Sequence, residues 1–267
     1  MACIYTHNRF ALEVLPRLSE EAKDIARSHM DLYRFGNQGP DLYFFNFRMA
    51  VKKNAPGTFI HDRPGKNFII KNIPVIKRAG FDSQTGAYMI GSILHFILDS
   101  HIHPTVNKLV TPTYSHLDIE TELDRFYMIL DGNDPLAYRQ EDLIPSPALA
   151  KYVYPLYKGY PDVNYIETER AMRDFKKVKK FFRPSSQTKE NFLLTVMKIP
   201  GLSQFTGQIL RQKPLKPAAY SNKVLATLVD EAIEKAPALV KAAMDFMKGE
   251  ADTLPEEFNC NYNGVKR

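Results

Sequence analysis

Residues 95–120 read HFILDSHIHPTVNKLVTPTYSHLDIE and hold four of the seven histidines in the chain. Two pairs in this stretch combine an imidazole with a carboxylate four residues later: His95 with Asp99, and His116 with Glu120. Side chains four residues apart lie on the same face of an α-helix, about 5–6 Å apart at Cβ. Each pair therefore has the spacing that two ligands of one metal ion require.

The first pair lies in an apolar sequence. His103 follows Asp99 by four more residues and extends the same helical stripe. An isolated His/Asp pair is usually a local ion pair, but charged groups in an apolar run are rare without a compensating partner, and a divalent cation provides one. Imidazole and carboxylate ligands suit zinc, with iron or manganese as alternatives. No cysteine lies near these residues, which excludes a structural thiolate site.

Helical periodicity dominates the chain, and no alternating strand pattern is present, so the sequence predicts an all-α fold. Apolar residues at helical spacing predict a long buried helix over 83–103, ended by Pro104 because the residue before a proline is disfavoured in the α region. A loop to about Tyr114 and a helix carrying His116 follow. Frequent prolines and glycines predict irregular structure over 50–80.

Four further segments complete the predicted organisation. Residues 8–29 form two helical segments split near Pro16, the second capped by Ser19. Residues 143–161 form a wrap or linker, 165–182 an amphipathic helix, and a last helix starts at a Ser221 cap, is interrupted at Pro237 and ends at Gly249. We expect a single all-α domain over 1–267, with a metal-site half (1–130) and an additional helical layer (131–267).

The composition is that of an ordinary soluble protein, with 44% hydrophobic and 25% charged residues among 267. The net charge of +6 fits an anionic substrate or membrane surface. Two cysteines, Cys3 and Cys260, do not make a disulfide framework. Neither a signal peptide nor a membrane-spanning run is visible, so we expect a cytoplasmic protein.

The run H-x-x-x-D, H-P, H-x-x-x-E resembles the zinc-dependent phospholipases C of the bacterial alpha-toxin type. More distantly, it is similar to the fungal single-strand nucleases, which share a trinuclear zinc architecture. Three upstream residues extend the resemblance in the same order: His7, Asp41 in a G-P-D turn, and His61. It covers roughly residues 5–125 and implies an all-α fold of the zinc-dependent phospholipase C type.

The resemblance implies a cluster of two or three zinc ions. One ion would bind His61, His95 and Asp99, and a second would bind His103, His116 and Glu120. A third would bind His7 and share Asp99; in the secreted relatives an N-terminal tryptophan completes that site. This chain has no tryptophan, so the amine of Ala2, with Cys3, is the substitute that we consider.

Asp41 matches the carboxylate that activates water in the family, and it is the candidate general base. Ordinary alternatives are a turn cap for Asp41, a loop pair with Asp62 for His61, and simple packing for His7. Two acidic residues after Glu120, Glu122 and Asp124, are either solvated or partners that orient His116.

The function that this implies is phosphodiester hydrolysis in a phospholipase C-like manner, with water activated by the metal ions. The alternatives are a nuclease or nucleotidase on the same scaffold, or a non-catalytic metal-binding helical module. The expected substrate is a phospholipid or a smaller phosphoester; no nucleic acid partner is expected beyond a substrate.

Two segments, one aromatic and one basic, have both a functional interpretation and an ordinary structural one. Residues 43–47 (YFFNF) can line an acyl-side or base-stacking wall, or can simply be core. The helix at 165–183 places Phe175 and Phe181 on one side and, on the other, Lys176, Lys177, Lys179 and Lys180. That basic side allows peripheral contact with an anionic membrane, or is a solvated face.

Overall fold

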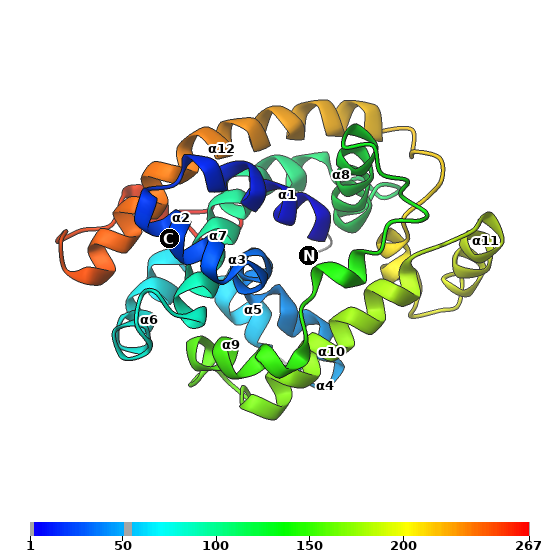
Figure 1. Ribbon diagram of the computed structural model, residues 1–267. Coiled ribbons are helices and arrows are strands. Elements are labelled where there is room, and N and C mark those ends of the chain that lie inside the picture. Colours follow the sequence, from blue (N-terminus) through cyan, green and yellow to red (C-terminus); the bar gives the residue numbers. More distant parts are fainter. Residues whose placement is uncertain (1–2, 51–54, 267) are drawn as a thin grey trace.

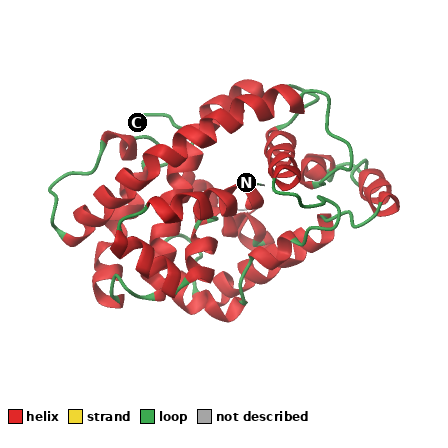
Figure 2. Cartoon of the chain, turned by 45° about the horizontal axis from the view of Figure 1, so that its top comes forward, coloured by secondary structure: helices red, strands yellow, loops and turns green. Residues whose placement is uncertain are grey.

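The computed structural model describes residues 3–50 and 55–266, and within these ranges the chain is all-α, as predicted (Figure 2). The α-helices are α1 (Ile4–Val14), α2 (Glu20–Ser28), α3 (Met30–Gly36), α4 (Phe47–Ala50), α5 (Pro56–His61), α6 (Gly65–Ala79), α7 (Gln84–Leu109), α8 (His116–Leu130), α9 (Ala150–Tyr157), α10 (Tyr165–Phe182), α11 (Gln187–Val196) and α12 (Ala218–Lys248). Short 3-10 segments are η1 (Leu15–Arg17), η2 (Gly39–Phe45), η3 (Gln140–Leu143), η4 (Pro147–Leu149), η5 (Ser203–Gln208) and η6 (Glu256–Asn259). None of the described helices combines the length and apolar character needed to span a bilayer.

Helix α7 is the central element, and α3 and α12 pack along it. Its residues are buried almost without interruption from Thr85 to Asp99, because neighbouring helices contact it on several sides. In Figure 1, α12 runs across the top of the molecule above α1, α7 and α8, and these contacts bury its apolar stripe. One hydrophobic core joins residues from both halves of the chain. The division at residue 130 remains a prediction.

Helices α3 and α7 cross in backbone contact at two glycines. A Cβ atom on Gly91 would lie 2.3 Å from the carbonyl oxygen of Tyr33 and 2.7 Å from Cα of Gly36. Only glycine permits this approach. The crossing places the segment that follows α3 directly over His95: a Cβ atom on Gly39, whose φ is +46°, would lie 2.3 Å from Cδ2 of that imidazole.

Two prolines lie inside helices that we expected them to end or interrupt. Helix α7 continues past Pro104 to Leu109, so the predicted end at residue 103 is wrong. The C-terminal segment packs there: a Cβ atom on Gly264 would lie 2.5 Å from Cγ of Pro104 and 2.6 Å from the carbonyl oxygen of Ser100. The C-terminal segment is therefore in close contact with the helix at the position where the proline removes a backbone hydrogen bond.

Helix α12 likewise continues through Pro237. It begins at Ala218, so Ser221 is an interior residue and not the predicted cap. The predicted end is confirmed, because Gly249 adopts a left-handed conformation (φ +86°) at the C-cap.

The expected irregular region over 50–80 is wrong for its described part, which forms α5 and α6. Pro56 is the first residue of α5 and Pro64 is the N-cap of α6. Prolines at these positions start helices and do not break them. Residues 51–54 lie outside the described part of the chain.

Elsewhere the helix assignments agree well with the sequence. Ser19 caps α2, and α10 has the predicted bounds. The segment expected to be a linker, 143–161, contains α9.

The glycine crossing predicts an effect on stability. Alanine in place of glycine favours an isolated helix by about 1 kcal/mol, yet Gly91→Ala places a methyl group against backbone atoms that cannot move independently. We expect overpacking of about 1–3 kcal/mol to exceed that gain, so the free energy of unfolding in urea falls. Gly36→Ala, at the other glycine of the crossing, would place Cβ 2.3 Å from the carbonyl oxygen of Tyr88 and should lower the free energy of unfolding likewise. A Gly91→Ala protein as stable as the unmodified chain would contradict the crossing.

Candidate metal centre

One face of α7 supplies the middle of the centre. His95, Asp99 and His103 are buried and lie at successive four-residue steps. Nε2 of His95 lies 3.3 Å from Oδ2 of Asp99, and Nδ1 of His103 lies 3.8 Å from the same oxygen. The predicted stripe is thus present, with the carboxylate between its two imidazoles.

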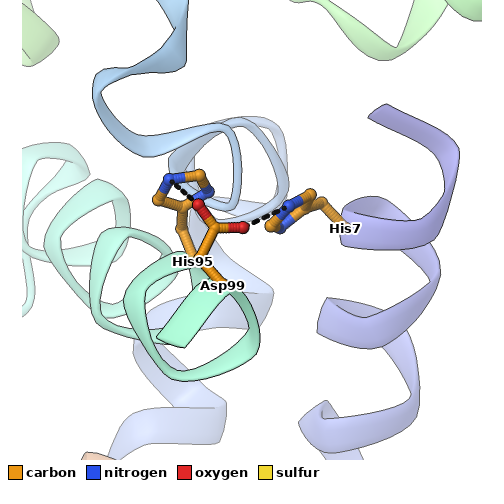
Figure 3. A group of neighbouring side chains, drawn as sticks. All are labelled: His7, His95 and Asp99. Atoms are coloured by element: carbon orange, nitrogen blue, oxygen red, sulfur yellow. Dashed lines mark ion pairs between the residues drawn. The ribbon is translucent and has the colours of Figure 1, made fainter. Parts of the chain in front are cut away.

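Helix α1 brings His7 to the other oxygen of Asp99. Nε2 of His7 lies 3.2 Å from Oδ1 of Asp99, and Figure 3 shows His7 and His95 approaching the carboxylate from two helices. Asp124 on α8 holds the first turn of α1: its carboxylate accepts hydrogen bonds from the backbone N–H groups of Tyr5 (3.1 Å) and Thr6 (2.8 Å). A carboxylate at a helix N-terminus is favourable, so Asp124 fixes the helix that carries His7.

Asp41 on η2 and His61 at the end of α5 meet beside Asp99. Nε2 of His61 lies 3.1 Å from Oδ1 of Asp41 and 3.6 Å from Oδ2 of Asp99. The alternative loop pair of His61 with Asp62 does not form in the described chain. Asp41 is buried and faces the cluster, which is a different role from a turn cap on the surface.

Helix α8 supplies the remaining two residues. Oε1 of Glu120 lies 3.3 Å from Nε2 of His116 and 3.3 Å from Nε2 of His103. Ser115 begins this helix with a capping box that also involves Asp118, which fixes the first turn and with it His116. The predicted group of His103, His116 and Glu120 therefore converges.

Four of the imidazoles are oriented by hydrogen bonds on the side away from the cluster. Nδ1 of His61 lies 2.8 Å from the carbonyl oxygen of Gly57, and Nδ1 of His95 lies 3.1 Å from that of Asn37. The matching partners are the carbonyl oxygen of Tyr262 for His103 (3.0 Å) and the side-chain oxygen of Asn107 for His116 (3.3 Å). Oxygen acceptors require a proton on Nδ1, which leaves each Nε2 to face the carboxylates. Metal-binding histidines commonly have this arrangement.

The charges of the cluster are strongly coupled. Burial alone would raise the pKa of Asp99, but His103, His95 and the other nearby imidazoles outweigh it and hold that pKa well below its usual value. Burial lowers the pKa of His95 to about 4. For His61 burial also acts downward, yet Asp41 and Asp99 prevail and raise its pKa to about 10. The carboxylates thus remain anionic in a buried setting that calls for positive charge.

The side chains fit a metal ion. Three groups have ligand atoms within 4.8 Å of one another: His7, His95 and Asp99; Asp41, His61 and His95; and His103, His116 and Glu120. Within the described chain, Nδ1 of His7 and Nε2 of His95 are buried and have no hydrogen-bond partner. Buried polar atoms without partners are rare, and a metal ion held by His95 would satisfy Nε2 of that residue. Nitrogen and carboxylate donors are those that zinc takes.

These groups differ in detail from the prediction. Asp41 belongs to a ligand group with His61 and His95, closer to the cluster than a separate base requires. The thiol of Cys3 donates to the carbonyl oxygen of Glu120 (3.2 Å) and is in none of the three groups. The proposed amine ligand, Ala2, lies outside the described residues.

Glu122 and Asp124, which we considered as partners of His116, form hydrogen bonds with other parts of the chain. Asp124 binds α1, and Glu122 accepts a hydrogen bond from the backbone N–H of Leu215 (3.0 Å). His101 lies apart from the cluster, with Nε2 3.1 Å from a carboxylate oxygen of Glu231 on α12.

Tyr262 also takes part in the centre, although no feature of the sequence indicates it. Its carbonyl oxygen accepts from His103, its N–H donates to the carbonyl oxygen of His61 (3.2 Å), and its ring centroid lies 4.7 Å from that of His61. Two of these contacts use backbone atoms, which any residue possesses, so the residue type carries no signal.

The sequence predicts Lys179 on the basic side of α10, and this prediction is wrong. Lys179 follows Phe175 by four residues, so it lies on the packed face, where it is buried. Its Nζ donates to Oε1 of Gln208 (3.4 Å). Burial lowers the pKa of Lys179, while Asp124 and the carboxylates of Glu120 and Asp41 act in the opposite direction.

The comparisons with known proteins point to one family. The family model described as zinc dependent phospholipase C matches residues 5–166, more than half of the chain, and this range contains all eight residues of the cluster. Comparison with curated proteins and with solved structures finds no significant match. The all-α fold and the family match agree with the resemblance found in the sequence. The chain belongs to the zinc-dependent phospholipase C family.

Proposed function

We propose that the protein hydrolyses phosphodiester bonds in a phospholipase C-like manner, with two or three zinc ions at the candidate metal centre. One observation carries the proposal: five imidazoles and three carboxylates from five separate elements form one connected cluster. Asp99 lies beside four of the imidazoles, and Glu120 lies beside His103 and His116. The expected substrate is a phospholipid or a smaller phosphoester, in keeping with the family.

The proposed ligand sets are those of the sequence prediction, and the set of His103, His116 and Glu120 coincides with one of the three groups. His103, His116 and Glu120 would hold one ion, and His61 and His95 would hold a second with Asp99. His7 would hold a third through the other oxygen of Asp99, which would then bridge two ions. Zinc in such a site polarises a phosphoryl oxygen and lowers the pKa of a bound water toward about 7.

In the proposed reaction the protein itself supplies the carboxylate of Asp41 as a base and holds the imidazoles in fixed orientations. Asp41 is buried, and hydrogen bonding to His61 helps to hold its pKa below the usual value in spite of burial, so Oδ1 and Oδ2 are both acceptors at neutral pH. We propose that this carboxylate accepts the proton of the attacking water. The outward hydrogen bonds on Nδ1 keep the imidazoles from rotating as the substrate binds.

We also propose peripheral contact with anionic lipid near α10, over a smaller surface than the sequence suggested. Lys177 and Lys180 are exposed and Phe181 is about half-exposed, whereas Lys179 is buried and unavailable to a membrane.

The shared carboxylate predicts the effect of Asp99→Asn on metal content. Asp99→Asn replaces one ligand oxygen by an amide nitrogen and removes the negative charge that the ions would share, so we expect loss of more than one equivalent of zinc by elemental analysis. Glu122→Gln, a buried carboxylate outside the cluster, is the matched control and should retain all metal. An unchanged zinc content in Asp99→Asn would contradict bridging.

The role of Asp41 predicts a separation between binding and turnover. If Asp41 is the base, Asp41→Asn lowers kcat at least about tenfold while zinc content stays at the level of the unmodified protein. Loss of one equivalent of zinc would instead make Asp41 a ligand, and unchanged kcat would exclude both roles.

Metal removal provides the test of the proposed function. A chelator should abolish hydrolysis of methyl p-nitrophenyl phosphate, and added zinc should restore it, because the metal supplies the electrostatic stabilisation. Circular dichroism of the chelated protein monitors the helical fold. Turnover that persists after complete metal removal would overturn the mechanism.

A further inference from the structure

An apolar groove is lined by residues of η2, α4, α10, α11 and η5 and of the chain between α11 and η5. Helices α4, α10 and α11 lie toward the lower right and right of Figure 1. The groove has a volume of about 460 Å³, within the usual range of ligand sites. Six phenylalanines dominate its lining: Phe44, Phe45, Phe47, Phe181, Phe182 and Phe205. The polar residues of the lining are Lys177 and Gln208.

One wall of the groove packs against a residue of the metal centre. This wall belongs to η2, the segment that also carries Asp41. The ring centroid of Phe44 lies 5.3 Å from that of His61. A molecule in the groove therefore borders on a side chain that packs against a proposed ligand.

The opposite wall rests on the helix that supplies Glu120. Segment η5 packs on α8, where Thr121 donates a hydrogen bond to the carbonyl oxygen of Gly207 (2.6 Å). A Cβ atom on Gly207 would lie 2.6 Å from Cβ of Leu117, so the two backbones are in close contact. The groove is thus bounded by two elements that hold the cluster.

Charge and polarity select the kind of occupant. The ammonium of Lys179 donates to Gln208 in the groove lining and lies 5.9 Å from the ring centroid of Phe45. Apart from Lys177 and Gln208 the lining is apolar, which suits a hydrocarbon chain. A peptide backbone would need hydrogen-bond partners along its length, and this lining offers few.

We propose that the groove binds the hydrocarbon chain of an amphiphilic phosphodiester and makes the enzyme selective for chain length. This inference rests on the proposed function. Most of the groove, including Phe181, Phe182 and Phe205, lies beyond residue 166, where the family match ends. Most of the subsite is therefore formed by residues outside the family-matched part of the chain.

The test uses p-nitrophenyl phosphodiesters that carry a methyl, butyl, hexyl or octyl group, each below its aggregation concentration. With zinc-loaded protein, kcat/KM should rise by up to about fourfold per added methylene and level off once the groove is full. Val178→Trp fills the groove and should flatten this rise. Phe192→Trp on α11, at a side chain that is 60% exposed and outside the lining, should preserve it. If Val178→Trp fails to fold, Leu202→Arg replaces it.

The outcomes separate the two proposals. No hydrolysis of the methyl ester by zinc-loaded protein would overturn the proposed function. Hydrolysis at a rate independent of chain length would overturn the groove inference alone, as would a rise unaffected by both groove variants. A preference for long chains that appears only above the aggregation concentration would assign the effect to membrane adsorption. A dimer dissociated by Val178→Trp, with no chain-length dependence, would assign the groove to a second copy.

Discussion

The buried carboxylate of Asp99 is the constraint on which the rest of the structure depends. Four imidazoles from three helices lie within 3.8 Å of its oxygens: His7, His61, His95 and His103. A carboxylate in the core is costly unless charged and hydrogen-bonding partners surround it. Helix α7 can therefore be central and apolar only if α1 and α5 bring their histidines to the same point. The carboxylate of Asp124 at the start of α1 and the backbone of Tyr262 beside His61 and His103 keep these partners in place.

Packing and chemistry are joined most closely where α3 crosses α7. The Gly36–Gly91 contact brings the chain after α3 within hydrogen-bonding distance of the His95 imidazole, through the carbonyl oxygen of Asn37. The same segment continues through Gly39 into η2, which carries Asp41. A change in the helix crossing would thus move an orienting acceptor and a carboxylate together, so the apolar core determines the geometry of the polar centre.

The sequence predicted the parts of the centre that depend on local periodicity. His95, Asp99 and His103, like His116 and Glu120, share a helix face because of their four-residue spacing, which requires no tertiary information. His7, Asp41 and His61 came only from their order in a family resemblance, because a loop or helix terminus gives an isolated residue no periodic signal. The backbone acceptor at Tyr262 and the contacts that accommodate Pro104 arise between residues distant in sequence. Lys179 was misplaced for a different reason: its spacing from Phe175 indicated the packed face, but its charge suggested solvent.

The two parts of the chain contribute differently to the candidate enzyme. The family-matched residues 5–166 contain every proposed ligand, whereas residues beyond them provide the Tyr262 acceptor, the buried Lys179 and most of the groove. Side chains of η5 and α11 face the groove without touching a ligand, so substitutions there can alter the space offered to a substrate while the metal centre stays intact. Tyr262 is different, because its carbonyl oxygen orients the imidazole of His103 and its N–H holds the backbone of His61. The C-terminal region therefore combines a part that the centre needs with a part that is free to set specificity.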